Sequence, residues 1–273
     1  MRRLGEAIAV NGLLAAGAVV CAAPLLWMLS VSLMPAGEAT AFPPALVPSA
    51  PTLAHYRELA TRLQLGRQAA NSAILATLAT ALGLATSSLA GYAFAKLRFA
   101  GRDRLFRFLL AGLVVPGQVA MLPLFLLLRE LGLVNSYAGV LVPSLASLFG
   151  IFLVRQHMLR IPDSDLGAAR LDGAGELRIW ATIALPLSRP ILVTLATFLF
   201  MGSWNDFLWP LIVLADDRLY TLPVALANLA GEHVQDTELM MAGAVLTVVP
   251  VVVLFVALQR YYLAGIMGGG VKG

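Results

Sequence analysis

The sequence predicts an all-α membrane protein in which one domain crosses the bilayer six times. Of its 273 residues, 59% are apolar and only 12% are charged, and the mean hydropathy is +0.84. A soluble domain of this length needs far more charge to cover its surface. Six apolar stretches also approach the roughly 20 residues that a helix needs to cross the hydrocarbon core.

The six expected spans are separated by polar segments. The first follows Arg2 and Arg3, with a kink expected near Pro24, and its apolar run exceeds that of a cleaved signal peptide, so we expect it to be retained. The second is rich in small residues, which let neighbouring helices approach closely and favour a central position. Within a single domain of residues 1–273, the expected spans are residues 8–34, 69–95, 105–128, 137–154, 191–214 and 241–263.

The distribution of basic residues predicts how these spans are oriented. If both termini lie on one side, that side holds fourteen Lys and Arg residues and the opposite side holds five. Lys and Arg are enriched in cytoplasmic loops. We therefore expect both termini, and the segment 159–190 between the fourth and fifth spans, to face the cytoplasm.

Segment 159–190 is too charged to lie in hydrocarbon, and its first half is patterned like a helix. Pro162 followed by Asp163 predicts a helix start. Leu166, Ala169 and Gly173 then fall on one face at helical spacing. Gly173 is also the residue at which this helix can stop and turn.

The second half of the segment predicts another short helix, which begins at about Glu176. Leu177, Trp180 and Ala184 are expected on one side of it, and Pro186 is expected to end it. The two helices together form a folded elbow at the membrane surface.

Two interpretations of this elbow follow from its pattern. Small residues at Ala168, Ala169 and Gly173 would let the groove of a partner protein close around the first helix, with Arg170 and Asp172 at its rim. Alternatively, the helices could lie on lipid headgroups, with an aromatic side chain at the interface. The first helix is Ala-rich and lacks the bulky apolar face of membrane-surface helices, which favours the partner protein.

Asn205 and Asp206 are the other candidate functional residues. They lie about midway along the expected fifth span, between Trp204 and Trp209. A carboxylate at that depth is unfavourable unless it is paired or hydrated, so it marks a polar contact or a pathway. Two interpretations stay open: a structural hydrogen bond to a neighbouring broken helix, and the lining of a solute path.

Several function classes are disfavoured by what the sequence lacks. The single cysteine, Cys21, and three scattered histidines predict no disulfide framework and no metal site. No catalytic or cofactor-binding constellation is evident, and Gly268–Gly270 lack the strand and helix context of a nucleotide-binding loop. A secondary carrier would need coupling-ion ligands and two repeated halves, whereas one intramembrane acid and no evident repeat are present.

Five stretches resemble one family, the integral-membrane permease subunits of bacterial ATP-binding-cassette (ABC) importers. AARLDGAG followed by IALPLSRP resembles their cytoplasmic EAA loop, in the version found in carbohydrate importers. The terminal stretch resembles the second, shorter permease of the maltose-transporter type. Besides the elbow, the four stretches are AFPPALVPSAPTLAHYREL, PGQVAMLPLFLLLRELGLVNSYAGVLVP, WNDFLWPL and the terminal stretch QRYYLAGIMGGGVKG.

The resemblance implies a type I importer permease core in a bacterial or archaeal plasma membrane. Such a chain forms half of a translocation path together with a second permease subunit. An extracytoplasmic solute-binding protein delivers a sugar, oligosaccharide or polyol, and two copies of a cytoplasmic ATPase bind ATP and Mg²⁺. The chain itself would be non-catalytic and would bind no cofactor. Its other contacts would be with membrane lipid, and none with nucleic acid.

The resemblance also assigns roles to residues. Those expected to couple to the ATPase are Ala168, Ala169, Arg170, Asp172, Gly173, Ala174, Leu185 and Pro186, with a further contact from Gly268, Gly269 and Gly270 in the tail. This chain departs from the family motif at one position, because Gly167 stands where the motif has its leading glutamate. Asp165 faces another side of the helix and cannot replace it. We therefore expect Arg170 or Asp172 to carry more of the docking.

Overall fold

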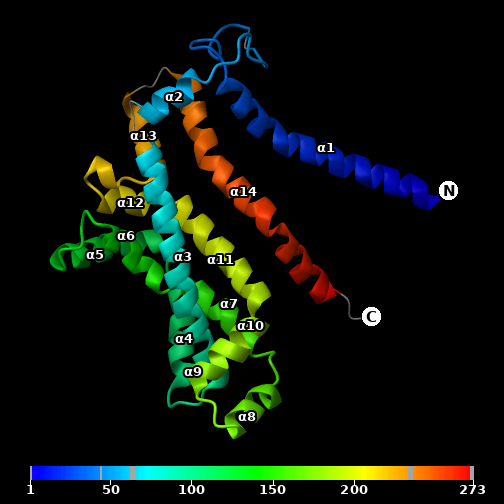
Figure 1. The fold of residues 1–273 in the computed structure, drawn as a ribbon, viewed down its shortest axis with the longest axis vertical. Helices are drawn as coiled ribbons and strands as arrows, with labels where there is room; N and C mark the ends of the chain where they lie inside the picture. Colours follow the sequence, from blue (N-terminus) through cyan, green and yellow to red (C-terminus); the bar gives the residue numbers. More distant parts are fainter. Residues whose placement is uncertain (1, 44, 62–64, 233–235, 271–273) are drawn as a thin grey trace. The chain divides into compact units, whose positions relative to one another are not determined.

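The computed structural model describes residues 2–43, 45–61, 65–232 and 236–270, and it contains helices and no strand in these ranges (Figure 1). The all-α fold class is therefore as predicted. The helices are α1 (Arg2–Val31), α2 (Ala54–Thr61), α3 (Leu65–Lys96), α4 (Arg102–Gly112), α5 (Gly117–Glu130), α6 (Tyr137–Leu141), η1 (Val142–Leu145), α7 (Leu148–Met158), α8 (Asp163–Leu171), α9 (Glu176–Ile179), η2 (Trp180–Ala184), α10 (Leu185–Leu187), α11 (Arg189–Trp204), α12 (Leu208–Val213), η3 (Asp217–Leu219), α13 (Leu222–Glu232) and α14 (Thr237–Gly270).

Four helical stretches of the described chain are long and apolar enough to cross a bilayer on their own. They are Val10–Val31, Leu65–Lys96, Tyr137–Met158 and Thr237–Gln259. The number rises to six if each of two sharply bent helix pairs counts as one span. These pairs are Arg102–Gly112 with Gly117–Glu130, bent by 102°, and Glu176–Leu187 with Arg189–Trp204, bent by 85°.

The expected third span, residues 105–128, is not one continuous helix. α4 ends at Gly112, α5 begins at Gly117, and the two meet at 102°. Pro116 explains the break, because it lacks a backbone N–H and disfavours the helical conformation at the residue before it. Pro116 instead becomes the N-cap of α5, with φ −59° and ψ 132°.

The expected fifth span, residues 191–214, is also interrupted. α11 ends at Trp204, and α12 begins at Leu208 after a short non-helical turn. Pro210 contributes to this break, because it has no N–H to donate to the carbonyl of Asp206, as a continuous helix would require. The Asn205 side chain donates to the Met201 carbonyl at 2.9 Å, beside the end of α11.

The helices fall into two compact units, Met1–Gly66 with Ala225–Pro250 and Arg67–Val224 with Val251–Gly273. In the first unit, Glu238 is almost fully buried and its carboxylate accepts a 2.8 Å hydrogen bond from the backbone of Ala39. The ring of His55 bonds the Met34 carbonyl at 2.9 Å. These contacts satisfy polar groups that would otherwise be unfavourable in the interior.

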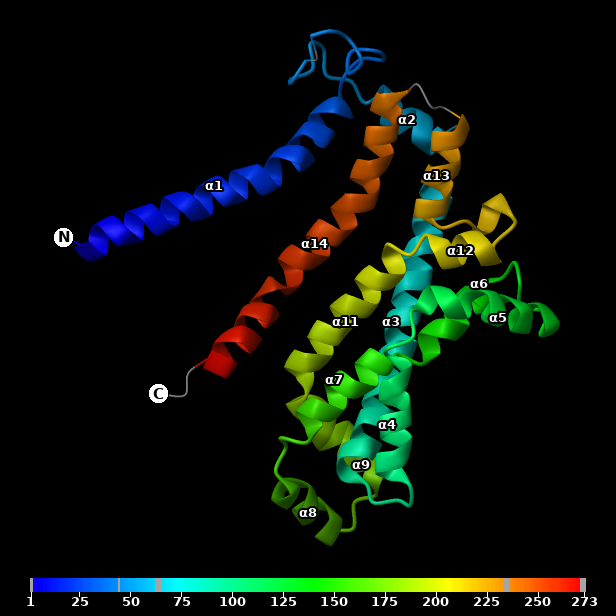
Figure 2. The ribbon, with the colours of Figure 1, turned by 180° about the vertical axis from the view of Figure 1, so that it is seen from behind.

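The second unit is built on α3, α7 and α11, which lie side by side in both views (Figures 1 and 2). Small residues on α3 allow the close packing that the sequence predicted. A Cβ added at Gly91 would lie 2.7 Å from Val154 Cγ1 of α7, and one at Gly83 would lie 3.0 Å from Leu199 Cδ1 of α11. Their shared core contains Tyr92, Ala95, Val154, Met158, Ile161, Leu166, Ile179, Ala184 and Leu195.

A polar cluster around Asn71 connects the N-terminal part of α3 to the loop after α12 within the same unit. The Asn71 amide donates to the carbonyls of Arg218 and Tyr220, at 2.9 Å each, and accepts a 2.6 Å hydrogen bond from the Tyr137 hydroxyl. Ser72 accepts from the backbone N–H of Leu222 at 2.8 Å. The loop after α12 is thereby tied to α3, which helps to hold α12 in place beside α5 and α6.

Candidate functional site

The segment between α7 and α11 forms a helical elbow whose first turn is as predicted. α8 begins at Asp163 after Pro162 and ends at Leu171. Gly173 adopts φ +79°, a conformation that other residues rarely accept. The backbone N–H groups of Gly173 and Ala174 donate to the carbonyls of Arg170 and Ala169, at 3.0 Å each, which closes a Schellman turn.

The second helix begins at Glu176, as expected, but differs in two respects. Leu177 is 72% exposed and does not share a side with the buried Ala184. Trp180–Ala184 form a π-helical turn, which has more residues per turn than an α-helix. Leu177 and Ala184, seven residues apart, therefore do not fall on the same side of the helix. Ile179 is the residue that is buried instead of Leu177. Pro186 does not end the helix. It lies within α10, after the widened turn, and the chain bends next to Ser188.

The inward side of the elbow is part of the main core of the second unit. Leu166, Ile179 and Ala184 are fully buried, and they pack in the same cluster as Tyr92 of α3 and Met158 of α7. Burying a leucine or isoleucine side chain stabilises a fold by about 1.5–3 kcal/mol. The elbow is therefore anchored on the helices that it connects.

Two residues near the end of α3, Tyr92 and Lys96, form hydrogen bonds with the elbow. The Tyr92 hydroxyl donates to Glu176 Oε2 at 2.6 Å, and Arg170 Nε donates to Glu176 Oε1 at 2.7 Å. Four residues further along α3, Lys96 Nζ donates to Asp163 Oδ1 and to the Ile161 carbonyl, both at 2.6 Å. The hydrogen bond from Lys96 lowers the pKa of the Asp163 carboxyl below its usual value.

The expected ATPase-contacting residues divide into two groups. Ala168 and Asp172 are exposed, whereas Ala169 and Ala174 are half-buried against the core. Arg170 is paired with Glu176 of the same chain, at 2.7 Å, and its guanidinium remains partly exposed, so its docking role stays a prediction. Of the closing part of the motif, Leu185 is half-buried and Pro186 is exposed.

Two exposed leucines were missed by the sequence analysis. Leu171 is 91% exposed at the end of α8, and Leu177 is 72% exposed on α9. Leu171 could have been recognised because it falls off the helical spacing that places Leu166 and Ala169 inside. Leu171 and Leu177 are thus large apolar side chains that remain exposed on a well-anchored element.

Gly167, at the position of the missing glutamate, has room for a side chain. A Cβ added there would meet nothing within 4 Å. No packing constraint therefore explains the glycine at this position.

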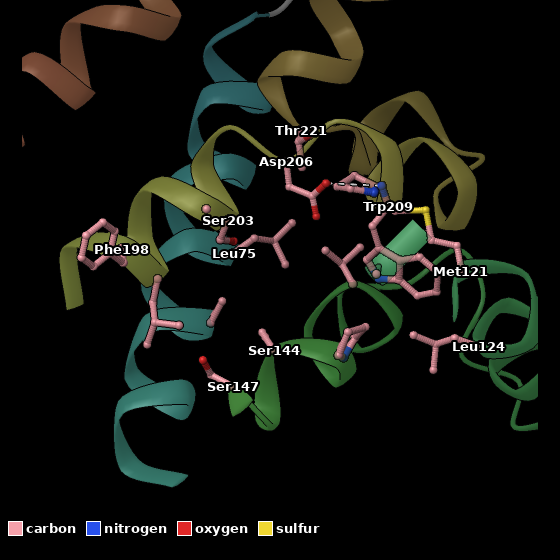
Figure 3. A pocket seen from close by; sticks show the side chains of 17 residues that line it. Leu75, Met121, Leu124, Ser144, Ser147, Phe198, Ser203, Asp206, Trp209 and Thr221 are labelled. Carbon is pink, nitrogen blue, oxygen red and sulfur yellow. Dashed lines mark hydrogen bonds between the residues drawn. The ribbon is translucent and has the colours of Figure 1, made fainter. Parts of the chain in front are cut away.

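A second candidate site is a cavity of about 400 Å³ inside the second unit (Figure 3). Figure 3 shows apolar side chains such as Leu75 and Phe198 along its walls, together with a small number of polar groups. Its polar side chains are Ser144, Ser147, Ser203, Asp206 and Thr221. A mostly apolar wall with a few polar groups is typical of a small-molecule site.

The structure brings Asp206, but not Asn205, to this cavity. Both lie in the turn between α11 and α12, and not midway along a helix as predicted, because the helix ends at Trp204. The Asp206 carboxylate lines the cavity and accepts a long, 3.4 Å hydrogen bond from the backbone of Trp209. Asn205 is exposed and is absent from the described lining. Both interpretations of Asp206 therefore remain compatible with its position.

Trp209 forms one wall of the cavity and is fixed by its own contacts. Its indole N–H donates to the Gly139 carbonyl at 3.2 Å, and its ring packs with Leu128 and Val213. Gly139 has no space for a Cβ, because the Leu133 carbonyl lies against it. The indole is therefore held in one orientation beside the cavity.

The glycine-rich tail was expected to follow a span that ends near residue 263. α14 instead continues to Gly270 and includes Gly268 and Gly269, while residues 271–273 lie outside the described chain.

Comparison with known proteins places the chain in a family. The family model of the binding-protein-dependent transport system inner membrane component matches residues 83–267. The arabinooligosaccharides transport system permease protein AraQ of Halalkalibacterium halodurans is 41% identical over 203 residues, which cover 74% of this chain and 73% of that protein. The galactooligosaccharides transport system permease protein GanQ of Bacillus subtilis is 33% identical over 272 residues, which cover 96% and 94%.

A solved structure supports the same assignment. One chain of a crystal structure of a bacterial ABC transporter involved in alginate import matches with a TM-score of 0.82 and 25% identity, covering 96% of this chain and 97% of that chain. The chain therefore belongs to the family of binding-protein-dependent transport system inner membrane components and is a non-catalytic, multi-pass permease subunit.

Proposed function

We propose that this chain is one of two permease subunits of an ATP-driven importer of sugars, oligosaccharides or related polyols, and that an ATPase docks on its elbow. The observation that carries the docking proposal is the exposure of Leu171, at 91%, on an elbow whose other face is buried. With Leu177 and Ala168, it supplies apolar area for a partner's groove. Covering one such leucine contributes about 1.5–3 kcal/mol.

The contacts to α3 give this docking surface a mechanical role. Lys96 holds the start of α8 through Asp163, and Tyr92 holds the start of α9 through Glu176. A displacement of α8 by the ATPase would pass to α3 through these contacts and to α7 and α11 through the shared core. Closure of the ATPase would in this way move the helices that line the cavity.

The carbohydrate class of solute rests on the relatives and on the cavity. AraQ, GanQ and the melibiose/raffinose/stachyose import permease protein MelC are named for oligosaccharide transport. In the cavity, Trp209 offers an aromatic surface, and Asp206 with the serine hydroxyls offers hydrogen-bonding groups. A sugar presents both apolar ring faces and hydroxyl groups, so this lining complements it.

The remaining parts of the proposal follow the charge distribution and the family. Residues 1–273 would act as one permease domain, with both termini and the elbow in the cytoplasm of a bacterium or archaeon. A solute-binding protein would approach from the opposite side, and ATP with Mg²⁺ would bind to the ATPase. Asp172, which is exposed beside Leu171, would supply the polar contact at the rim of the docking surface.

The docking proposal is tested by charge substitution of the exposed leucines. Leu171→Asp and Leu177→Asp should each reduce co-purification of the ATPase at least tenfold and abolish ATP-dependent uptake. Leu53→Asp is a matched control, because Leu53 is 67% exposed but lies before α2, on the expected opposite side. Retained ATPase binding in both test variants would disprove docking on this surface. Uptake that continues without ATP but with a proton gradient would point to a secondary carrier.

A further inference from the structure

The turn between α3 and α4 forms a basic hollow that the proposed transport mechanism does not use. It has a volume of about 600 Å³. Phe99, Gly101 and Asp103 contribute to its lining, but most of it is arginine: Arg98, Arg102, Arg104 and Arg107. Four guanidinium groups thus surround a space that contains one carboxylate.

Two of the four arginines are available to bind a ligand. Arg102 is occupied within the turn, since its Nε donates to Asp103 Oδ1 at 3.0 Å and its Nη1 donates to the Leu97 carbonyl at 3.2 Å. Arg107 donates to the Asp103 carbonyl at 3.3 Å. Arg98 and Arg104 are exposed, and no hydrogen bond from either side chain is found within the described part of the chain. Arg98 also lies close enough to Asp163 to help lower the pKa of that carboxyl. The lining of the hollow therefore carries four positive charges and one negative charge.

Exposed apolar side chains adjoin the hollow. Phe99 is 42% exposed, Leu105 is 48% exposed and Phe108 is 75% exposed. The opposite side of α4 packs inside the protein, where Phe106 contacts Phe94 of α3. Phe99 packs one side of its ring against Phe94, at 5.9 Å between ring centroids, and remains partly exposed, whereas Phe108 is mostly exposed and follows Arg107 in the chain.

The position of the hollow identifies the kind of ligand. α3 is a candidate membrane span that ends at Lys96, and α4 begins at Arg102 after a short turn. If α3 spans the bilayer, the hollow adjoins the end of a membrane-spanning helix, where lipid headgroups are found. A basic hollow beside exposed aromatic and aliphatic side chains matches an amphiphile with an anionic head and an apolar tail.

We propose that the α3–α4 turn binds the phosphate of an anionic phospholipid, with Arg98 and Arg104 contacting the headgroup and Phe108 and Leu105 contacting its acyl chains. Guanidinium groups bind phosphate oxygens with charge-assisted and often paired hydrogen bonds. Each basic residue near an anionic lipid surface changes lipid affinity by roughly fivefold. Loss of both free arginines should therefore weaken binding on the order of twentyfold.

The test measures lipid binding to the full-length chain. Native mass spectrometry would count phosphatidylglycerol and phosphatidylcholine molecules retained by the wild type, by Arg98→Gln/Arg104→Gln, and by Arg98→Lys/Arg104→Lys. We expect the wild type and the lysine variant to retain phosphatidylglycerol in preference to phosphatidylcholine, and the glutamine variant to lose this preference. The control Arg57→Gln/Arg129→Gln makes the same charge change on α2 and α5 and should behave as the wild type.

Three outcomes would overturn the proposal. One is equal retention of phosphatidylglycerol by the glutamine variant and the wild type. Another is displacement of the lipid by inorganic phosphate but not by chloride at equal ionic strength, which would indicate a site for free anions. The third is unchanged lipid retention with loss of a co-purifying cytoplasmic subunit, which would assign the hollow to a protein. An unchanged unfolding temperature in phosphatidylcholine nanodiscs would show that the variants are folded.

Discussion

The Tyr92 hydroxyl donates a 2.6 Å hydrogen bond to the Glu176 carboxylate, which connects α3 to the start of α9 across 84 residues of sequence. Tyr92 is 3% exposed, and its ring is part of the core that also holds Leu166 of α8. One side chain thus contacts both the interior of the helix bundle and the polar base of the elbow.

Tyr92→Phe should weaken the stimulation of ATP hydrolysis by solute more than it destabilises the fold. The ring stays in place, and loss of the single hydrogen bond should reduce the free energy of unfolding by about 1 kcal/mol. Solute-stimulated ATP hydrolysis in proteoliposomes should fall severalfold. Tyr56→Phe is the control, because it removes a comparable 2.7 Å contact, to Ser32, that lies within the first unit and involves no residue of the elbow. Equal effects of both substitutions on hydrolysis would argue against a coupling role for Tyr92.

The ion pair between Lys96 and Asp163 predicts a pH dependence of stability. Folding lowers the pKa of Asp163 below its usual 3.8, so the pair stabilises the folded chain above that pH. The stabilisation is lost as the pH falls through the lowered folded-state pKa. Unfolding temperatures of the wild type and Asp163→Asn should therefore differ at neutral pH and converge in acid. Asp165→Asn is the control, because it makes the same charge change on α8 and leaves the Lys96–Asp163 ion pair in place; its unfolding temperature should follow that of the wild type. A gap of the same size at every pH would contradict the ion pair.

Gly167→Glu should strengthen both α8 and its docking. The added side chain meets open space, and replacing a glycine inside a helix stabilises it by about 0.5–1 kcal/mol. The new carboxylate can form a charge-assisted contact with the ATPase, worth about 1.5–3 kcal/mol when well formed. Binding of the ATPase, measured by titration in detergent, should tighten about tenfold or more.

The matched control for Gly167→Glu is the same change at Gly173. Gly173 has φ +79°, so a side chain there strains the turn regardless of the space around it. Gly173→Glu should lower the unfolding temperature and weaken docking. Weaker docking of Gly167→Glu itself would show that the groove of the partner requires a glycine at that position.

Asp206→Asn should raise the KM for uptake about tenfold if its carboxylate binds solute in the cavity. The substitution keeps an oxygen that can accept from the Trp209 backbone, so the break between α11 and α12 should persist. Asn205→Ala is the control outside the cavity lining and should leave KM unchanged. Unimpaired uptake by Asp206→Asn would return this residue to a structural role.

Removal of residues 268–273 should weaken coupling without preventing membrane insertion. α14 includes Gly268–Gly270, so the deletion shortens the end of this helix and leaves the apolar stretch Thr237–Gln259 intact. The readout is solute-stimulated ATP hydrolysis, with the amount of membrane-inserted chain as the reference. An unchanged rate of stimulated hydrolysis would remove the tail from the proposed ATPase contacts.

The sequence predicted those features that depend on local chemistry. Gly173 marked the turn of the elbow because a helix stop commonly requires a positive φ, and Glu176 marked the next helix start correctly. Pro116 and Pro210 lay within the expected third and fifth spans, but their effect was underestimated, because apolar length alone does not show where a helix divides. The exposure of Leu177 depends on the π-helical turn after it, which spacing rules for an α-helix do not reveal.

The candidate site was predicted in part for the same reason. Asp206 stood out because an acidic residue is unusual in an apolar stretch, whereas Ser144 and Thr221 reach the cavity from segments far apart in sequence. The pairing of Arg170 with Glu176 was also missed. It requires the elbow to fold back so that residues on α8 and α9 meet, which no spacing along one helix can show.

The contact between Gly91 and Val154 sets how closely α3 and α7 can pack. Because α3 has no side chain there, Val154 and the backbone of Arg155 on α7 come within 3.1 Å of the place that a Cβ would occupy. A side chain at position 91 would have to displace Val154, and so it would separate the two helices between which the base of the elbow is packed.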